Sequence, residues 1–222
     1  MRIFPLGENA LTVEFGNEIS LELNRQALQL AEYFQKNPFP GFIETVPAYA
    51  STTLFYHPLT VRKAFVEYPS AFDAVTSLVE TAALTSEKSQ GRSKTVIKIP
   101  IIIDRDSSPD LEVISEFSGL PMDEVISIYL ERTYTVFMLG FLPGFPYMGE
   151  VDEKIACPRK QTPRLKVPKG SVGIAGKQTG IYPLESPGGW QIIGRTEMQI
   201  FDPASERPCG LTPGDEVRFV RV

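Results

Sequence analysis

Apolar positions in the first third of the chain alternate between the spacing of strands and the spacing of helices. Short apolar segments predict strands at residues 2–5, 10–15, 42–46 and 52–56. Between Ser20 and Asn37 the apolar residues recur at helical spacing, and a second helix is predicted from about Ser70. The order ββαββα favours a small α+β domain, with helices on one face of a mainly antiparallel sheet.

A polar segment separates this part from the rest of the chain. No apolar residue occurs between Thr85 and Lys94. We interpret residues 86–94 as a linker, between an α+β domain at 1–85 and a second domain at 95–222.

The second part has a different pattern. Its first predicted strand covers 95–103, and Pro100 removes a backbone donor there, which favours an edge strand or a bend. Two helices are predicted, one from an N-cap at Ser108 to Gly119 and one at about 122–131. Residues 140–214 hold 12 of the 17 glycines and 10 of the 19 prolines. Short apolar stretches predict the strands of a barrel or sandwich at 171–175, 180–184, 190–193, 198–201 and 216–222.

Composition narrows the function classes. Hydrophobic residues make up 42% of the chain and charged residues 22%, which is typical of a folded protein. Apolar runs are too short for a membrane span, and no signal peptide is evident at the first residues. Cys157 and Cys209 fit no metal or redox spacing, so a reduced, cytoplasmic protein is expected.

The chain has a single histidine, His57. A single histidine cannot form a metal site with two or three histidine ligands, and we expect no metal. Because a proline follows it, we expect His57 at a strand end or in a turn.

Positive charge is concentrated in one stretch. Seven basic residues and no acidic ones occur from 154 to 177, namely Lys154, Arg159, Lys160, Arg164, Lys166, Lys169 and Lys177. The remainder has 15 basic against 27 acidic residues, a balance of −12. The stretch indicates either an anionic ligand or acidic partner surface, or a solvated loop-rich face. Nucleic acid is disfavoured, because the chain is acidic overall and no stacking aromatics separate these charges.

The glycine-rich segment 170–179 is not a phosphate-binding loop. A glycine is required where Ser171 stands, and the residue directly after Lys177 is Gln178 instead of the required Ser or Thr. We expect these glycines to allow close approach between strands or to a ligand. Two further segments, 140–147 and 187–190, combine glycine, proline and aromatic residues and are compatible with tight barrel corners.

Several of these segments together are characteristic of a known family. They are Gly140 to Tyr147, Pro158 to Lys160, Pro163 and Arg164, Val167 and Pro168, Gly170 to Ile174, Gln178 to Pro183, Ser186 to Trp190, Ile193 to Thr196 and Pro213 to Asp215. They closely resemble the kinase A inhibitor family, whose members are also called allophanate hydrolase subunit 1 or the B subunit of 5-oxoprolinase. Ala10, Leu11, Val13, Phe15 and Gly16 agree as well, so the resemblance covers essentially the whole chain.

The resemblance implies a fold and a leading function. It implies an α+β N-terminal domain and a cyclophilin-like β-barrel at 95–222. It implies a subunit of an ATP-dependent 5-oxoprolinase, a hydrolase that opens 5-oxoproline to L-glutamate. The expected partners are a homologous larger cyclophilin-like subunit and a third component, with ATP bound mainly by a partner. We expect no activity from the chain alone.

Two other functions are also compatible with the sequence. One is a regulatory protein that inhibits a sensor histidine kinase through an acidic surface of the kinase. The other is a carboxyltransferase-type half related to urea carboxylase.

Six residues are candidates for binding substrate or another anion. Arg159 and Arg164 offer planar forks for a carboxylate or phosphate, and Arg164 is preferred because no acidic residue lies near it in sequence. Gln178, Tyr182 and Gln191 offer neutral hydrogen bonds, while Trp190 is either an apolar wall or structural. The catalytic residues are not identified. Many members of the resembling family carry a histidine at the position of Tyr129, so either that histidine is not catalytic or this chain differs from those members.

Overall fold

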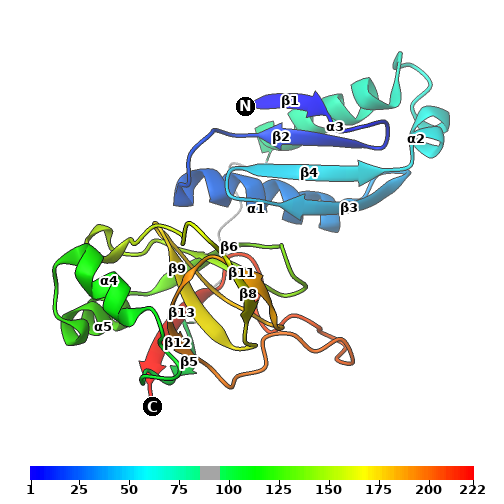
Figure 1. Cartoon of the computed structure of the whole chain (residues 1–222). Coiled ribbons are helices and arrows are strands. Elements are labelled where there is room, and N and C mark those ends of the chain that lie inside the picture. Colours follow the sequence, from blue (N-terminus) through cyan, green and yellow to red (C-terminus); the bar gives the residue numbers. More distant parts are fainter. Residues whose placement is uncertain (86–95) are drawn as a thin grey trace. The chain divides into compact units, whose positions relative to one another are not determined.

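The computed structural model describes residues 1–85 and 96–222, which belong to two compact units (Figure 1). The units are Met1–Arg92 and Ser93–Val222. The linker interpreted at 86–94 lies outside the described residues. Within the described part, no helix combines the length and apolar character needed to cross a membrane.

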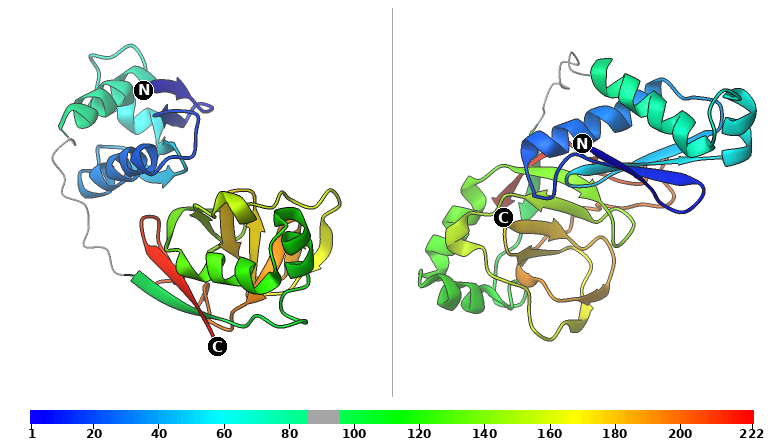
Figure 2. Two further views of the ribbon diagram at one scale, coloured as in Figure 1. Left: turned by 90° about the vertical axis from the view of Figure 1, so that its left-hand side faces the viewer. Right: turned by 90° about the horizontal axis from the view of Figure 1, so that it is seen from above.

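The first unit is an antiparallel sheet with its two long helices on one face (Figure 2). The strand order is β1-β2-β4-β3. The strands are β1 (Arg2–Pro5), β2 (Ala10–Glu14), β3 (Phe42–Pro47) and β4 (Ser51–Tyr56). The helices are α1 (Leu21–Lys36), α2 (Pro58–Ala64) and α3 (Ala71–Thr85). Leu11, Leu30, Leu54 and Val75 are buried between sheet and helices, so the α+β arrangement predicted for this part is confirmed.

One short helix of the first unit was not predicted. Helix α2 begins at Pro58, and His57 is its N-cap residue. Proline suits the first helical position, because it lacks a backbone N–H and a residue at that position donates no hydrogen bond within the helix. The expectation that His57 lies at a strand end is confirmed, because His57 directly follows the last residue of β4, while the helix that begins after it was not expected.

The second unit is built on a mixed sheet of seven strands that almost closes into a barrel (Figure 1). The strand order is β12-β9-β10-β7-β6-β13-β5. These strands are β5 (Val96–Ile101), β6 (Tyr134–Leu139), β7 (Pro146–Gly149), β9 (Ser171–Ala175), β10 (Gln178–Ile181), β12 (Gln191–Arg195) and β13 (Glu216–Arg221). The other elements are α4 (Leu111–Ser118), α5 (Met122–Glu131), the 3-10 turn η2 (Glu153–Ile155) and a two-stranded ribbon of β8 (Arg164–Val167) and β11 (Ser186–Gly188).

The two edge strands of this sheet meet at a seam. Strand β5 is an edge strand, as Pro100 predicted. Directly after it, Ile102 exchanges two backbone hydrogen bonds with Arg195 at the end of β12, at 2.8 and 3.0 Å. Further along the same seam, the N–H of Asp110 donates to the carbonyl of Ile192 at 3.2 Å. The segment between β5 and α4 therefore closes most of the gap between the edges.

Several sequence predictions for this unit need correction. Helix α4 starts at Leu111 with Asp110 as its N-cap residue, so the start predicted at Ser108 was too early. Its end at Gly119 is confirmed, because that residue has a left-handed φ of 68°. The stretch 198–201 forms only an isolated bridge from Phe201 to Cys209. Four strands, β6, β7, β8 and β11, were not predicted. Strands β7, β8 and β11 have three or four residues and contain or border glycine or proline, whereas β6 has an uninterrupted apolar pattern that was overlooked.

Tyr129 lies in the barrel core and not at a surface site. Its hydroxyl shares a 2.7 Å hydrogen bond with that of Thr179, and Tyr134 donates to its backbone carbonyl at 2.8 Å. Burial raises the pKa of the Tyr129 phenol far above its usual range. The side chain is therefore neutral and structural, and the position is an interior one.

The ribbon β8–β11 covers the outer face of the barrel, and glycines make the close packing possible. A Cβ atom at Gly188 would lie 2.3 Å from the Tyr182 hydroxyl oxygen, and one at Gly180 would lie 2.8 Å from the ring of Phe145. These distances are too short for any real side chain. In the glycine-rich segment 170–179, for which close approach was predicted, a Cβ atom would lie 2.1 Å from the Thr196 carbonyl oxygen at Gly170 and 3.0 Å from Trp190 at Gly173. The prediction is confirmed for these two glycines, whereas nothing lies within 4 Å of a Cβ atom at Gly176.

We predict that Gly188→Ala lowers the free energy of unfolding by about 2 kcal/mol, because Tyr182 is buried and overpacking forces it from its position. The neighbouring Gly189→Ala is a matched control, since its nearest neighbour would lie 3.6 Å away. We expect this control to change stability by less than about 0.5 kcal/mol. Denaturant unfolding measures both variants, and equal stabilities would contradict the packing argument.

Candidate functional site

A buried carboxylate holds two of the predicted cationic residues at the barrel seam. Asp110 Oδ1 accepts hydrogen bonds from Arg164 Nη2 at 2.5 Å and from Lys160 Nζ at 3.1 Å. Asp110 Oδ2 accepts the backbone N–H of Ile192 at 2.7 Å. Only 2% of the Asp110 side chain is exposed, against 27% for Arg164 and 26% for Lys160. We call this arrangement of Asp110, Lys160, Arg164 and the Ile192 N–H the Asp110 clamp.

The clamp keeps its carboxylate ionised. Burial acts to raise the pKa of Asp110, but the hydrogen bonds from Arg164, the Ile192 N–H and Lys160 outweigh it. The pKa of Asp110 is therefore below its usual value. Two cations against one anion leave the clamp with an excess of one positive charge.

A cluster of four aromatic side chains adjoins the clamp on the outer face of the barrel. The aromatic cluster consists of Phe145, Tyr147, Tyr182 and Trp190. Phe145 lies at its centre, with ring centroids 4.9 to 5.4 Å from the other three. Edge-to-face contacts of this kind add to the stabilisation from burial. Trp190 is only 5% exposed, so its structural role is clear and no open apolar wall is formed by it.

Arg159 lies over this cluster. Its guanidinium carbon is 5.6 Å from the centre of the Trp190 ring, which is within the range of a cation–π interaction. Arg159 is an exposed residue. Within residues 1–85 and 96–222 it has no ion pair, so its charge is available to a ligand.

Tyr182 connects the cluster with the clamp. The backbone N–H of Trp190 donates to its hydroxyl oxygen, and the charges of Arg159 and Arg164 act on it. Burial is the largest influence and raises the pKa of Tyr182 to about 12. Its phenol therefore stays protonated near neutral pH and keeps a donor O–H.

The structure brings together five of the six candidate residues and leaves one aside. Arg164 belongs to the clamp, while Arg159, Tyr182 and Trp190 meet in and above the aromatic cluster. Gln191 is buried on β12 between Trp190 and Ile192, and its Nε2 donates to the Pro158 carbonyl at 3.0 Å. Gln178 lies on the outward face of β10, and no hydrogen bond of its side chain occurs within the described residues.

Two polar atoms of these candidates are buried without a hydrogen-bond partner in the described part of the chain. They are Nη1 of Arg164 and Oε1 of Gln191. Arg164 therefore keeps one donor group that Asp110 does not use. Gln191 keeps one acceptor.

The reason for preferring Arg164 was wrong. The sequence places no acidic residue near it, but Asp110 comes 54 positions earlier and meets it through the fold. Other cations of the stretch are paired too, Lys166 with Glu185 at 3.1 Å and Lys177 with Glu153. Four of the seven basic residues thus have acidic partners, and the unneutralised charge is smaller than the stretch suggested.

Sequence reasoning also missed Asp110 and Tyr147. Asp110 carries one local signal, its position as N-cap of α4, where aspartate is a favoured residue type. Nothing in the spacing indicated that its side chain would turn toward Arg164. Tyr147 was part of the segment noted at 140–147 but was not singled out.

The glycine-rich segment is not a phosphate cradle, and the described part of the chain holds no cluster of metal ligands. The glycine-rich segment forms the hairpin between β9 and β10, and the Gly176 N–H is occupied by the Cys157 carbonyl at 2.8 Å. The backbone groups that a nucleotide would need are therefore unavailable there. Across residues 1–85 and 96–222, no group of three or more His, Cys, Asp or Glu side chains could hold a metal ion.

Comparison with known proteins places this arrangement in a family. Residues 1–211 match the family described as "Carboxyltransferase domain, subdomain C and D". The chain belongs to this family. The Asp110 clamp and the aromatic cluster both lie within the matched residues, so they are part of a carboxyltransferase-type domain.

Relatives within the carboxyltransferase family align along the whole chain. The B subunit of 5-oxoprolinase from Bacillus subtilis (strain 168) is 41% identical over 222 residues, covering 100% of this chain and 92% of the relative. The protein of the same name from Escherichia coli O157:H7 is 37% identical, covering 99% of this chain and 95% of the relative.

A solved structure agrees with the same family membership. The crystal structure of TTHA0988 has a TM-score of 0.81 and 37% identity over 96% of this chain. The chain spans 40% of the length of TTHA0988. The match to TTHA0988 therefore covers only part of that larger protein.

We predict that Asp110→Asn lowers the free energy of unfolding by about 2 kcal/mol at pH 7, since charge-assisted hydrogen bonds are lost while the partly exposed cations regain water. The folded-state pKa of Asp110 is below the unfolded value of 3.8, so its stabilisation is present above that pH. It is lost as the pH falls through the lower folded-state pKa. The difference from wild type should therefore be constant from pH 7 to about 5 and shrink below about 4.

Denaturant unfolding across this pH range is the measurement. Asp106→Asn is the matched control, because Asp106 is exposed in the same connection. An Asp110→Asn protein as stable as wild type at pH 7 would exclude the clamp as a stabilising element.

Proposed function

We propose that this chain is a subunit of an ATP-dependent 5-oxoprolinase that opens 5-oxoproline to L-glutamate. The main support is the full-length similarity to two proteins named as the B subunit of 5-oxoprolinase, at 41% and 37% identity. The proposed partners are a larger homologous subunit and a third component. ATP is assigned to a partner, because the glycine-rich segment of this chain forms a β-hairpin and not a phosphate-binding loop.

We infer the same domain plan that the resemblance implied. Residues 1–85 form an α+β domain, 86–94 a linker and 95–222 a cyclophilin-like barrel. The nearly closed seven-strand sheet supports the barrel assignment.

The residues near the aromatic cluster suit the chemistry of the substrate. 5-Oxoproline carries one carboxylate and a lactam that resists hydrolysis, so binding its anionic group and stabilising developing charge are the tasks of the protein. ATP, when bound to the complex, supplies activation of the lactam oxygen. Arg159 is exposed above Trp190 and has no acidic partner in the described residues, which makes it the residue to bind a carboxylate.

Arg164 has a different role in this proposal. Nη2 is held by Asp110, so its guanidinium is fixed in place before any ligand arrives. Nη1 remains as a donor for an acceptor atom of the substrate. Tyr182, protonated because its pKa is about 12, supplies a neutral donor nearby.

Reconstitution tests the function directly. The purified chain should release neither ADP nor glutamate from ATP and 5-oxoproline by itself, because its glycine-rich segment is a β-hairpin and not a phosphate-binding loop. Addition of the larger subunit and the third component should start coupled release of both products. Turnover by the rigorously purified single chain, or none by the complete mixture, would refute the proposal.

We predict that Arg159→Ala and Arg164→Lys affect the complex in different ways. Arg159→Ala should raise KM for 5-oxoproline about tenfold, equal to about 1.4 kcal/mol of binding, with an unchanged melting temperature. Arg164→Lys keeps the charge but loses the planar fork on buried Asp110, so its melting temperature should fall by several degrees and its activity about tenfold. Steady-state kinetics and thermal unfolding separate the two, and full activity of Arg159→Ala would exclude it as the carboxylate ligand.

A further inference from the structure

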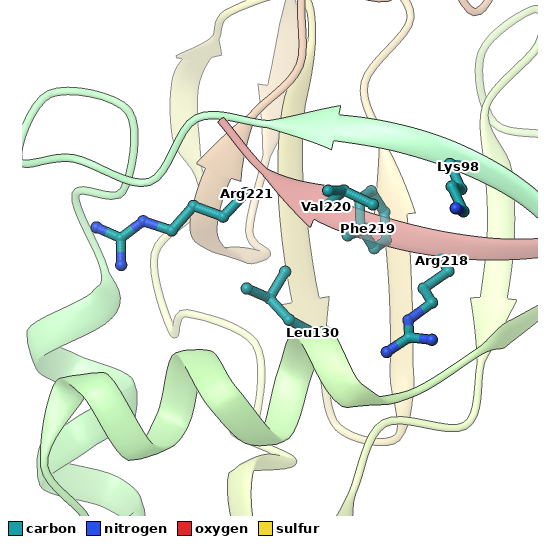
Figure 3. Close-up of a pocket in the computed structure, with 6 residues that line it drawn as sticks. All are labelled: Lys98, Leu130, Arg218, Phe219, Val220 and Arg221. Carbon is teal, nitrogen blue, oxygen red and sulfur yellow. The ribbon is translucent and has the colours of Figure 1, made fainter.

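A hollow on the second unit, away from the Asp110 clamp, is lined by three basic residues around an apolar floor (Figure 3). Its volume is about 300 Å³. We call it the cationic hollow, and its residues are Lys98, Leu130, Arg218, Phe219, Val220 and Arg221. They come from β5, α5 and β13.

The positive charges of this hollow are not neutralised within the described part of the chain. The ion pairs found among residues 1–85 and 96–222 include none with Lys98, Arg218 or Arg221. Arg221 uses one N–H to reach the Ile103 carbonyl at 3.3 Å. Glu131 follows the lining residue Leu130 but is exposed and joins no such pair.

Two of these cations face each other across neighbouring strands. In the parallel register of β5 and β13, Lys98 is the direct partner of Arg218, and both residues are exposed. Like charges directly opposite each other destabilise a sheet. A carboxylate placed between them would convert this repulsion into two attractions.

The arrangement of the cations indicates an extended ligand. Figure 3 shows Arg221 and Arg218 reaching to opposite ends of the hollow, with Leu130 between them. The two arginines are three residues apart on β13, which corresponds to roughly 10 Å. Because the two guanidinium groups point to opposite ends in Figure 3, two separate anionic groups suit them better than one phosphate or one carboxylate. A peptide segment with an acidic residue on each side of two apolar residues matches both ends and the floor.

The surroundings of the hollow are those of a protein contact. Val96 and Val220 are each 41% exposed beside the cations, which gives an apolar area with a charged rim. The free edge of β5 is blunted, since Pro100 has no N–H and Ile102 is already bonded to Arg195. Strand addition along β5 is therefore disfavoured, and the contact at the hollow is argued from its side chains.

We propose that the cationic hollow docks an acidic segment of a partner chain, with two carboxylates flanking two apolar residues. The partner is the larger subunit of the proposed enzyme, so its identity rests on the proposed function, whereas the chemistry of the contact does not. Carboxylates pair with Arg218 and Lys98 at one end and with Arg221 at the other, while the apolar residues cover Leu130 and Val220.

A peptide titration tests the contact without any enzyme activity. The probe is the acetylated and amidated peptide Gly-Glu-Ile-Leu-Glu-Gly, whose acids have the spacing of Arg218 and Arg221. NMR shifts of the full chain should change at the six lining residues, and a peptide with glutamine in place of glutamate should bind at least tenfold more weakly. Lys98→Glu combined with Arg218→Glu should weaken binding of the acidic peptide at least tenfold.

Matched controls make the result decisive. Arg105→Glu combined with Arg207→Glu reverses two other exposed cations of the same unit and should leave peptide binding unchanged within twofold. Inorganic phosphate should not reproduce the peptide shifts. Equal binding of the glutamine peptide, equal loss in the control variant, shifts at other residues, or the same shifts with phosphate would each overturn the proposal.

Association with the purified larger subunit tests the partner. Lys98→Glu combined with Arg218→Glu should weaken this association at least tenfold. Lowering the salt concentration should strengthen the association of wild type more than that of the variant. Unchanged association would overturn the assignment of the hollow to this interface. If wild type itself failed to associate, the proposed function would fall, while the peptide titration would still decide the contact.

Discussion

The second unit depends on a carboxylate placed where its sheet almost closes. The backbone exchange between Ile102 and Arg195 joins the two edge strands at one point. Asp110 extends the junction, because its N–H and carboxylate both bind the backbone of Ile192 on β12. Its other oxygen binds Arg164 and Lys160, which bring the ribbon β8–β11 and the preceding loop to the same place. One side chain therefore connects the start of α4, the barrel edge and the segment that carries the candidate site.

This arrangement explains why cations can be held so near a hydrophobic core. Moving a charge out of water is costly unless it is paired and hydrogen-bonded. Asp110 compensates two cations that keep about a quarter of their side chains in solvent. Arg159 needs no such partner, because it is exposed and lies on the face of Trp190. The two arginines that looked alike in sequence thus differ in environment, one fixed by the fold and the other open to a ligand.

Local sequence patterns were enough for the elements that bury one regular face. Helices α1 and α5 and strands β2, β4, β9 and β13 follow from apolar periodicity, and Pro100 correctly marked an edge strand. Short strands bounded by glycine and proline, such as β8 and β11, carry too few residues to show a period. The pairing of Asp110 with Arg164 is a property of the closed sheet, since 54 residues separate the two, and no local rule reveals it. The meeting of Arg159 with Trp190 was likewise not predictable from spacing, although both residues were correctly named as candidates.

Whether a charged side chain of this protein is paired therefore depends on its neighbours in the folded structure and not on its neighbours in the sequence. The cationic stretch at 154–177 is the most basic part of the sequence, yet four of its seven charges are matched by Asp110, Glu185 and Glu153. Lys98, Arg218 and Arg221 are scattered in sequence and attracted no notice there, but β5 and β13 place them around one hollow without an acidic partner in the described residues. A paired charge lowers the free energy of the folded chain, whereas an unpaired one retains its capacity to bind an anionic group. The surfaces that matter for association are then those where the fold gathers charge that it does not neutralise.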